Sequence, residues 1–422
     1  MMKVAKITKQ KEIRFFEEPI PEVTKDDDVL VKIERLGICA SDIHYFTEGK
    51  FGTKKLIYPA TFGHQCMGKV IALGQGGKRY LIPGMTVTVD PTVACTVCDQ
   101  CLSGHPNRCR HLQYAGSPGE FPGMAAEYRI FPARNCVPVP SGFSMDDMLM
   151  TETLAVGLHA LSLSGFFDPD EYLAKLAMAG LTFMPINETG KWVMQPVAAS
   201  MRMVLKPFRE KNSGKKCLIL GAGPVGLGIL ICSKLLGVRN IMVVDPLESR
   251  LNMARFFGAT RVFNPLHPEN SHFVPKYFSP PDSSSEYSSF HFVPRNNTET
   301  LFSFMQKNSF SSFDFIFECT GDTGCTELAP SLLAPGGSLV QIGTPSQDTI
   351  SLNPHLFAEN ELQFISIQQQ NFCFRPILDW ITSMEIHPQK MQTHSFPFSQ
   401  IQTAFEMLME YREGIIKAVI TI

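Results

Sequence analysis

The sequence of 422 residues lacks a marked excess of either charge, because 38 lysines and arginines face 40 aspartates and glutamates. The net charge of −2 provides no basic surface of the kind that binds nucleic acid or an acidic membrane, so we expect neither partner. A long hydrophobic run is also missing. Residues 217–232 form the longest nearly apolar stretch, but glycines and Pro224 interrupt it and make it a poor membrane span.

An export signal is equally hard to find, since residues 1–16 carry lysine and glutamate and have no apolar core. We therefore expect a cytoplasmic protein in a reducing compartment. In such a compartment, twelve cysteines in a chain of this length are not expected to form a disulfide scaffold. Cys217, Cys232 and Cys319 stand alone in apolar runs and are expected to be buried thiols, whereas clustered cysteines indicate metal ligands.

One such cluster is present in a single short segment. Cys95, Cys98 and Cys101 are each separated by two residues, and Cys109 follows after seven intervening residues. Four thiolates at this spacing can close a tetrahedral site around one Zn²⁺. Because that site leaves no open position for a substrate, we expect it to be structural and look for a reactive metal elsewhere.

A second, open metal site is predicted from three residues spread along the first half of the chain. Cys39, His64 and Glu152 offer a thiolate, an imidazole and a carboxylate, and three protein ligands plus water are typical of catalytic zinc. Zinc there would lower the pKa of an alcohol, Ser41 would take its proton, and His44 would pass the proton to solvent. Singly, the three ligands have ordinary alternatives: a buried thiol, a core histidine and an acid at a helix start.

The pattern of apolar segments changes along the chain. Short β-type runs dominate residues 1–150, whereas from residue 215 apolar strands alternate with helices, which is typical of a parallel sheet with helices on both faces. Residues 168–213 and 266–298 do not fit either pattern. Part of the first, residues 171–181, is compatible with a helix, and we interpret the second as a long surface excursion.

A dinucleotide-binding turn is predicted where the alternation begins. Gly221, Gly223 and Gly226 follow the strand at residues 217–220 and open a helix, which is the context that this glycine motif requires. The helix start offers unpaired N–H groups to phosphates. Asp245 ends the next strand, where its carboxylate would accept ribose hydroxyls and repel a 2′-phosphate, so NAD is expected over NADP. The residues expected to contact the cofactor are Gly221, Gly223, Pro224, Val225, Gly226, Asp245 and Arg250.

Taken together, these residues resemble the zinc-dependent medium-chain alcohol dehydrogenase family, close to its sorbitol (polyol) dehydrogenase branch. The likeness extends over most of the chain outside the two irregular segments. The motifs that carry it are residues 37–45, 63–64, 95–109, 152–159, 221–226, 319–321 and 417–420.

The resemblance implies an α/β protein with a GroES-like β-rich catalytic domain and a Rossmann domain with a doubly wound parallel sheet. The catalytic domain would comprise residues 1–157 and 369–422, with the structural zinc lobe at about 90–112. The Rossmann domain would comprise residues 158–368, with insertions at about 168–213 and 266–298. The active site would lie between the domains, and the protein would be a homodimer or homotetramer.

The implied reaction transfers a hydride from the secondary alcohol of a polyol or sugar to NAD and gives a ketone. Family members usually have glutamate directly after the ligand histidine, whereas this chain has Gln65, so we expect Glu152 to bind the metal directly. Thr153 also replaces a usual proline, and residues 368–371 differ from the sorbitol enzymes. Two alternatives remain: a dehydrogenase of an amino-alcohol or hydroxy acid such as threonine, with Arg375 binding the carboxylate, and a non-catalytic nucleotide-binding protein.

Overall fold

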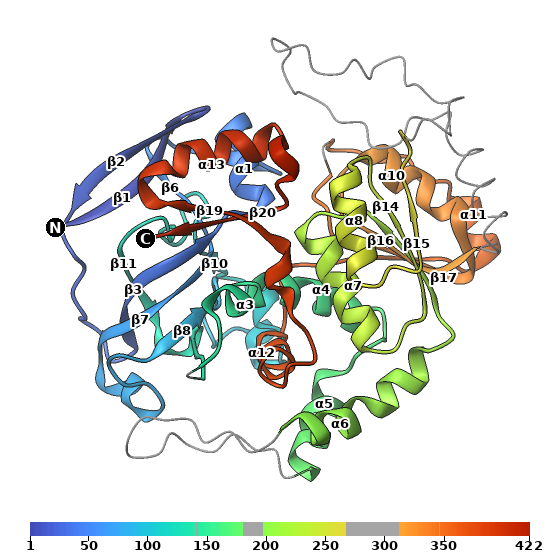
Figure 1. Ribbon diagram of the computed structural model, residues 1–422, viewed down its shortest axis with the longest axis horizontal. Coiled ribbons are helices and arrows are strands. Elements are labelled where there is room, and N and C mark those ends of the chain that lie inside the picture. Colours follow the sequence, from blue (N-terminus) through green and yellow to red (C-terminus); the bar gives the residue numbers. More distant parts are fainter. Residues whose placement is uncertain (141, 180–196, 267–311, 346) are drawn as a thin grey trace. The chain divides into compact units, whose positions relative to one another are not determined.

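The computed structural model describes residues 1–140, 142–179, 197–266, 312–345 and 347–422 (Figure 1). The chain divides into two compact units. Unit 1 comprises Met1–Val156, Pro169–Val204 and Gln368–Ile422, and unit 2 comprises Gly157–Asp168 and Leu205–Ile367. The predicted Rossmann domain, residues 158–368, includes all of residues 169–204, so the two divisions differ over that segment.

Unit 1 is built on sheets whose strands are antiparallel except for the parallel pair β19 and β20, and its short β-type runs predict such a β-rich unit. Its largest sheet has the order β12-β8-β7-β3-β20-β19, with β11 also pairing with β3, and a smaller sheet has the order β2-β1-β6. The strands of this unit are β1 Met2–Lys9, β2 Glu12–Glu18, β3 Asp28–Gly37, β4 Lys50–Phe51, β5 Lys54–Lys55, β6 Ala60–Thr61, β7 Gln65–Leu73, β8 Thr86–Val89, β9 Thr92–Val93, β10 Gln113–Tyr114, β11 Tyr128–Pro132, β12 Cys136–Pro138, β19 Gln392–Pro397 and β20 Lys417–Thr421.

At one end of three adjacent strands, β7, β3 and β20, the large sheet brings together residues that are far apart in the sequence. Strand β3 runs antiparallel to both β7 and β20, so its end meets their beginnings. In this register Gly37 pairs with Gln65 on one side and with Val419 on the other. The loop to the first helix begins at the same place, and Cys39 therefore lies close to His64 and Lys417.

The core of unit 1 lies between this sheet and a C-terminal helix. Val31 and Ile33 of β3 are fully buried, and Phe405 packs edge-on against Phe46 and Phe62. The helices that lie wholly in this unit are α1 Ala40–Glu48, α2 Asp99–Leu102, α3 Met145–Leu149, α5 Pro169–Met178, α12 Phe374–Thr382 and α13 Ile401–Met409. Two further helices, α4 Thr151–Leu163 and α6 Val197–Asn212, continue from one unit into the other.

Unit 2 contains a parallel sheet in the order β15-β14-β13-β16-β17-β18 (Figure 1). Numbered from its own first strand, this is the order 3-2-1-4-5-6 of a dinucleotide-binding fold, which reverses direction between β13 and β16. The predicted Rossmann-type sheet is therefore confirmed. Its strands are β13 Lys216–Leu220, β14 Asn240–Val244, β15 Arg261–Phe263, β16 Phe313–Glu318, β17 Leu333–Gln341 and β18 Gln363–Ser366.

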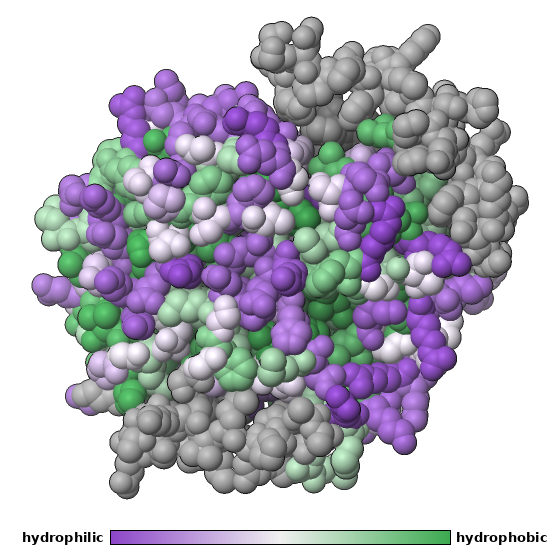
Figure 2. Space-filling model, in the orientation of Figure 1, coloured by the Kyte–Doolittle hydropathy of each residue, from purple (hydrophilic) through white to green (hydrophobic). Residues whose placement is uncertain are grey.

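The strands of unit 2 are almost continuously apolar because both faces of the sheet are covered. Leu218, Leu220, Met242 and Val244 are all fully buried. Hydrophilic side chains are spread widely over the face that Figure 2 draws. The helices of this unit are α7 Pro224–Leu235, α8 Glu248–Phe256, α10 Thr323–Leu328 and α11 Pro354–Asn360.

The two irregular segments have different outcomes. The helix expected within residues 171–181 is confirmed as α5, and α6 occupies the end of the same segment. Tyr172 of α5 is fully buried, so this part of the segment is packed into unit 1. Apart from residue 266, the excursion expected at 266–298 lies outside the described residues. Across the described helices, none is both long and apolar enough to cross a membrane.

Candidate active site and metal centres

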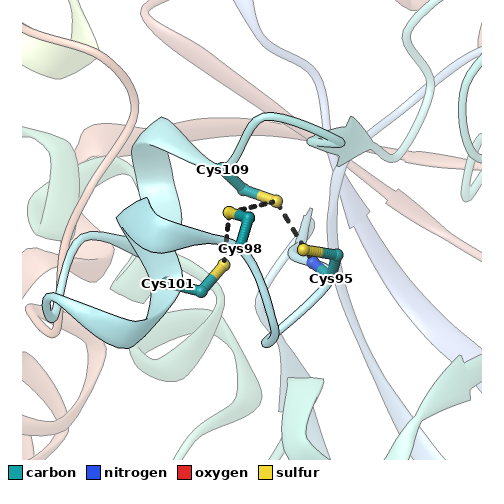
Figure 3. Close-up of side chains that lie close together, drawn as sticks. All are labelled: Cys95, Cys98, Cys101 and Cys109. Carbon is teal, nitrogen blue, oxygen red and sulfur yellow. Dashed lines mark hydrogen bonds between the residues drawn. The ribbon is translucent and has the colours of Figure 1, made fainter.

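The four predicted zinc-lobe cysteines lie together in unit 1 (Figure 3). Cys98 Sγ is 3.6 Å from Cys101 Sγ and 3.9 Å from Cys109 Sγ, and all four sulfur atoms lie within 4.8 Å of one another. Cys98 precedes the single-turn helix α2, which brings Cys101 back toward it. Within the described parts of the chain, this is the one group of histidine, cysteine and acidic side chains that is packed closely enough to hold a metal.

Backbone amides around the lobe favour thiolates. The N–H groups of Cys95 and His111 donate to Cys109 Sγ at 3.2 and 3.3 Å. The backbone N–H of Arg110 is the main cause that lowers the pKa of Cys98 to about 6. Burial and the neighbouring sulfurs raise the pKa of Cys101 to about 12. Four sulfurs this close can all be ionised only beside a cation, so the donor set fits a tetrathiolate zinc site.

Cys39 and His64 meet at the strand ends described above, and Asp42 contacts both residues. Cys39 caps α1, and its backbone N–H donates to Asp42 Oδ2 at 2.9 Å. Asp42 Oδ1 accepts the Gly63 N–H at 3.1 Å and lies 3.6 Å from His64 Nδ1. A carboxylate beside an imidazole is the usual outer partner of a metal-bound histidine, so this pair fits a metal site.

The electrostatics of the pair favour the thiolate. Burial raises the pKa of Cys39, but His64 outweighs burial and lowers that pKa overall. Burial lowers the pKa of His64, whereas Asp42 and Cys39 raise it well above its ordinary value. The pairing therefore shifts Cys39 toward the ionised form that binds metals.

Glu152 lies in the first turn of α4 and is 6% exposed. Its Oε1 accepts the Tyr114 hydroxyl at 3.2 Å, and its Oε2 accepts a hydrogen bond from Gln65 Nε2. Among the described residues, Glu152 does not form a closely packed ligand group with Cys39 and His64. Its assignment as the third ligand stays a prediction.

Ser41 and His44 lie three residues apart on α1, which puts them on neighbouring positions of one helix face. His44 Nδ1 is 2.7 Å from Glu48 Oε1, and both side chains are about half exposed, at 48% and 49%. Because the carboxylate only accepts, Nδ1 carries the proton and Nε2 is the accepting nitrogen of the neutral ring. The proton-transfer roles of Ser41 and His44 stay predictions.

The glycine turn after β13 has the geometry that its sequence predicts. Gly221 has φ +95°, which favours glycine, and a Cβ on Gly226 would lie 1.9 Å from the Gly221 carbonyl oxygen. A Cβ on Gly223 would meet nothing closer than Arg250 Nη1 at 3.9 Å, so the backbone there faces open space. Pro224 begins α7, where its missing N–H costs nothing, and Val225 follows it.

Asp245 is fully buried behind this turn. Its Oδ2 accepts the Ala222 N–H and its Oδ1 accepts the Leu247 N–H, both at 2.8 Å. Arg250 Nη1 lies 3.7 Å from Oδ2. Burial raises the pKa of Asp245, and Arg250 partly offsets this effect. Asp245 thus supports the turn itself, a role that the sequence analysis does not foresee.

Three further contacts at the site escape sequence analysis. Lys417 and Tyr114 contact Gln65 and Glu152, and Thr153 Oγ1 accepts from Gln65 Nε2 at 3.1 Å. Lys417 is 352 positions from Gln65, so local spacing gives no signal for the contact. The only available signal is that Lys417 begins a segment that resembles the dehydrogenase family.

Arg375, the candidate for binding a substrate carboxylate, is committed elsewhere. Its Nε donates to Asp379 Oδ1 at 2.7 Å, one helical turn along α12. Tyr172 of α5 donates to the other oxygen of Asp379 at 3.2 Å. This ion pair explains Arg375 without a substrate.

Comparison with known proteins assigns the lineage. A model of the alcohol dehydrogenase GroES-like domain matches residues 25–141, and a zinc-binding dehydrogenase model matches residues 290–413. The chain is 28% identical to the uncharacterized zinc-type alcohol dehydrogenase-like protein YdjJ of Escherichia coli, over 96% of this chain and 93% of the relative. It is 24% identical to the sorbitol dehydrogenase of Bacillus subtilis, over 99% of this chain and 97% of the relative.

Solved structures agree over the whole length. An oxidoreductase of unknown specificity from Escherichia coli has a TM-score of 0.75 at 25% identity and covers 100% of this chain and 99% of its own. An alcohol dehydrogenase from Escherichia coli CFT073 in complex with NADH gives 0.74 at 22% identity, covering 100% and 99%. A structure described as a zinc-binding dehydrogenase of Sinorhizobium meliloti 1021, bound to NADP, gives 0.71 at 22%, covering 100% and 99%.

The two family models, the full-length relatives and the shared two-part fold agree with one another. The predicted GroES-like domain is confirmed together with the Rossmann-type sheet. The chain thus contains an alcohol dehydrogenase GroES-like domain and a zinc-binding dehydrogenase domain, as its resemblance to the zinc-dependent alcohol dehydrogenases predicts.

Proposed function

We propose that the protein is an NAD-dependent polyol dehydrogenase that oxidises a secondary alcohol to a ketone. The observation that carries the proposal is the pairing of Cys39 with the buried His64, whose imidazole lies 3.6 Å from Asp42, in a chain that also has a complete dinucleotide turn. The names of the relatives support the substrate class, because they include sorbitol dehydrogenases and D-xylulose reductases.

Two zinc sites belong to this proposal. Cys95, Cys98, Cys101 and Cys109 would hold a structural zinc, and Cys39, His64 and Glu152 would hold a catalytic zinc. When bound, the catalytic zinc supplies Lewis acidity toward the alcohol oxygen, and NAD supplies the hydride acceptor.

Residues of the chain position the metal ligand His64 and carry the alcohol proton away. Asp42 fixes the His64 ring, while the Ser41 hydroxyl receives the alcohol proton and hands it to His44 Nε2. His44 then releases its Nδ1 proton toward Glu48, 2.7 Å away and half exposed, from which the proton reaches solvent.

The cofactor would lie on the turn formed by Gly221, Gly223 and Gly226. Pro224 has no N–H group, so the first N–H groups of α7, beginning at Val225, would face the pyrophosphate. Asp245 and Arg250 border the adenosine ribose, and the Asp245 carboxylate favours NAD over NADP because a 2′-phosphate would be repelled.

The test is NADH formation, followed by its absorbance, with zinc-loaded protein and a panel of polyols, simple secondary alcohols and threonine. We expect turnover of at least one polyol, loss of turnover in the Cys39→Ala variant, and full turnover in the matched Cys66→Ala variant. Preference for threonine would favour the amino-alcohol alternative. No turnover of any alcohol would leave the non-catalytic nucleotide-binding alternative.

The proposal also includes a homo-oligomer, dimer or tetramer, and a cytoplasmic location. Light scattering of the zinc-loaded protein measures the first, and fractionation of cells measures the second. A monomer at micromolar concentration would contradict the expected assembly.

A further inference from the structure

Gln65 occupies a buried position between a cation and an anion. It is the first residue of β7, directly after His64, and is 2% exposed. Lys417 Nζ donates to its Oε1, and its Nε2 donates to Glu152 Oε2 and, at 3.1 Å, to Thr153 Oγ1. The amide therefore joins the beginnings of β20 and α4 beside the Cys39–His64 pair.

The hydrogen-bonding capacities of the neighbours require an amide here. The Lys417 ammonium only donates, and besides Gln65 it donates to the Ile38 carbonyl at 2.8 Å. The ionised Glu152 carboxylate only accepts. Glutamine offers an acceptor to the first and a donor to the second. Glutamate would satisfy Lys417 but repel Glu152.

The surroundings are shaped for this side chain. A Cβ on Gly37, the β3 residue paired with Gln65, would lie 2.8 Å from Gln65 Oε1 and 3.2 Å from Lys417 Cε. A side chain at position 37 would press on the Gln65 amide and on the Lys417 side chain. Gly37, Gln65 and Lys417 thus form one packed arrangement across three adjacent strands.

We propose that Gln65 is the positioning residue of Glu152 at the open metal site. This inference rests on the proposed function, because it takes Glu152 to serve that site. Gln65 holds one carboxylate oxygen and Tyr114 holds the other, at 3.2 Å. Each oxygen keeps a further lone pair for a metal, and hydrogen-bonded carboxylates are the usual form of such ligands.

The proposal explains how the site tolerates the amide that replaces the family's usual glutamate. The amide itself adds no negative charge, so Cys39 and Glu152 remain the two anions that balance Zn²⁺. Gln65 instead orients the Glu152 carboxylate, and because Gln65 directly follows His64 in the chain, it fixes that carboxylate relative to His64.

The test is a double-mutant cycle on zinc affinity, read without any assay of turnover. Full-length protein is equilibrated at buffered free Zn²⁺ concentrations, and bound zinc is counted by elemental analysis. The variants are Gln65→Leu, Glu152→Ala and both together, with Gln402→Leu as the matched control. Gln402 is a bridging glutamine of α13, with its Nε2 2.7 Å from Glu406 Oε1.

We expect Gln65→Leu to weaken binding of the second zinc by about tenfold or more, as outer partners of metal ligands do. In the Glu152→Ala background the same substitution is expected to have no further effect. The proposal is overturned if Gln65→Leu leaves the zinc affinity unchanged. It is also overturned if Gln65→Leu lowers the zinc affinity as much in the Glu152→Ala background as in the wild type. A wild-type protein that binds only one zinc refutes the open metal site itself, and with it the proposed function.

Folding of Gln65→Leu is a separate matter, because the substitution leaves Lys417 with one acceptor fewer. If the variant does not fold, Gln65→Leu/Lys417→Met removes donor and acceptor together, which is far less costly. The cycle with Glu152→Ala is then run from Lys417→Met, with the same expected coupling and the same contradicting results.

Discussion

Asp245 is a single residue that carries both the glycine turn and the predicted ribose site. Its two oxygens accept the backbone N–H groups of Ala222 and Leu247, and Arg250 lies beside it. Oδ1 keeps a lone pair for a ribose hydroxyl, whereas Oδ2 also faces Arg250 Nη1 at 3.7 Å. Its charge, rather than its exposure, is therefore what would distinguish NAD from NADP.

Replacing Asp245 by alanine is expected to weaken NAD binding and to reduce the preference for NAD over NADP by about tenfold, equivalent to about 1.4 kcal/mol. The cause is loss of the carboxylate that repels a 2′-phosphate, with Arg250 left to attract it. Titration calorimetry with each cofactor measures both affinities. An unchanged ratio of the two affinities would show that Asp245 acts only on the turn.

Single residues also mark the limit of what the sequence predicts. The glycine turn was predictable because strand, turn and helix are adjacent in the chain. The bridging role of Gln65 was not, because it depends on Lys417, which lies 352 residues away and reaches it across neighbouring strands. The sequence reveals only that an expected glutamate is absent.

At the scale of elements, α5 and α12 meet at Asp379, which pairs with Arg375 of its own helix and accepts the Tyr172 hydroxyl of α5. Asp379 accepts from Arg375 and Tyr172, and burial still raises its pKa to about 6. The folded protein therefore holds this proton more tightly than the unfolded chain does. Between about pH 4 and 6 the contribution of Asp379 to stability falls as the pH rises.

Asp379→Asn is expected to remove this pH dependence. Relative to the wild type, the free energy of unfolding of the variant should rise by up to about 3 kcal/mol between pH 4 and pH 7, since one pKa unit corresponds to about 1.4 kcal/mol. Urea unfolding at several pH values measures it. A constant difference between the two proteins across this range would refute the raised pKa.

The zinc lobe and residues 368–371 form a second pair of coupled elements. Asn107 Nδ2 donates to the Gln368 carbonyl at 2.9 Å, and Asn371 Nδ2 donates to the Gly104 carbonyl at 3.0 Å. Gln370 Nε2 donates to Asp90 Oδ2 at 2.7 Å. The segment that departs from the sorbitol enzymes is thus held by the four-cysteine lobe.

Cys101→Ser is expected to loosen this segment by disrupting the lobe that holds it. Hydrogen exchange followed by mass spectrometry should show faster exchange in residues 368–373, where the Cys373 N–H donates to Gln370 Oε1 at 2.9 Å. Strand β13 of unit 2 serves as the internal control. Equal exchange of residues 368–373 in variant and wild type would mean that the lobe does not support them.

Elements were predicted best where hydrophobic patterning is strong. The strand predicted at residues 217–220 is β13, which begins only one residue earlier. Residues 168–213 were harder to interpret, because Tyr172 and its partners on α12 are separated by about two hundred residues and only the fold brings them together.

For the whole molecule, the folds of the two units were predictable from different kinds of sequence information. The parallel sheet of unit 2 was predictable from its alternating pattern, and its strand order follows from rules of βαβ connection. The antiparallel sheet of unit 1 joins β3 to β20 across most of the chain. That pairing was accessible only through resemblance to a known family, since no local pattern specifies it.

The central claim is that this chain holds an open metal site in addition to its four-cysteine lobe. The most direct test is the zinc content of the purified full-length protein, compared with the Cys39→Ala variant and the Cys66→Ala control. The account predicts two zinc ions per chain in the wild type and the control, and one in Cys39→Ala. A wild-type protein with one zinc, or a Cys39→Ala variant that keeps two, would contradict it.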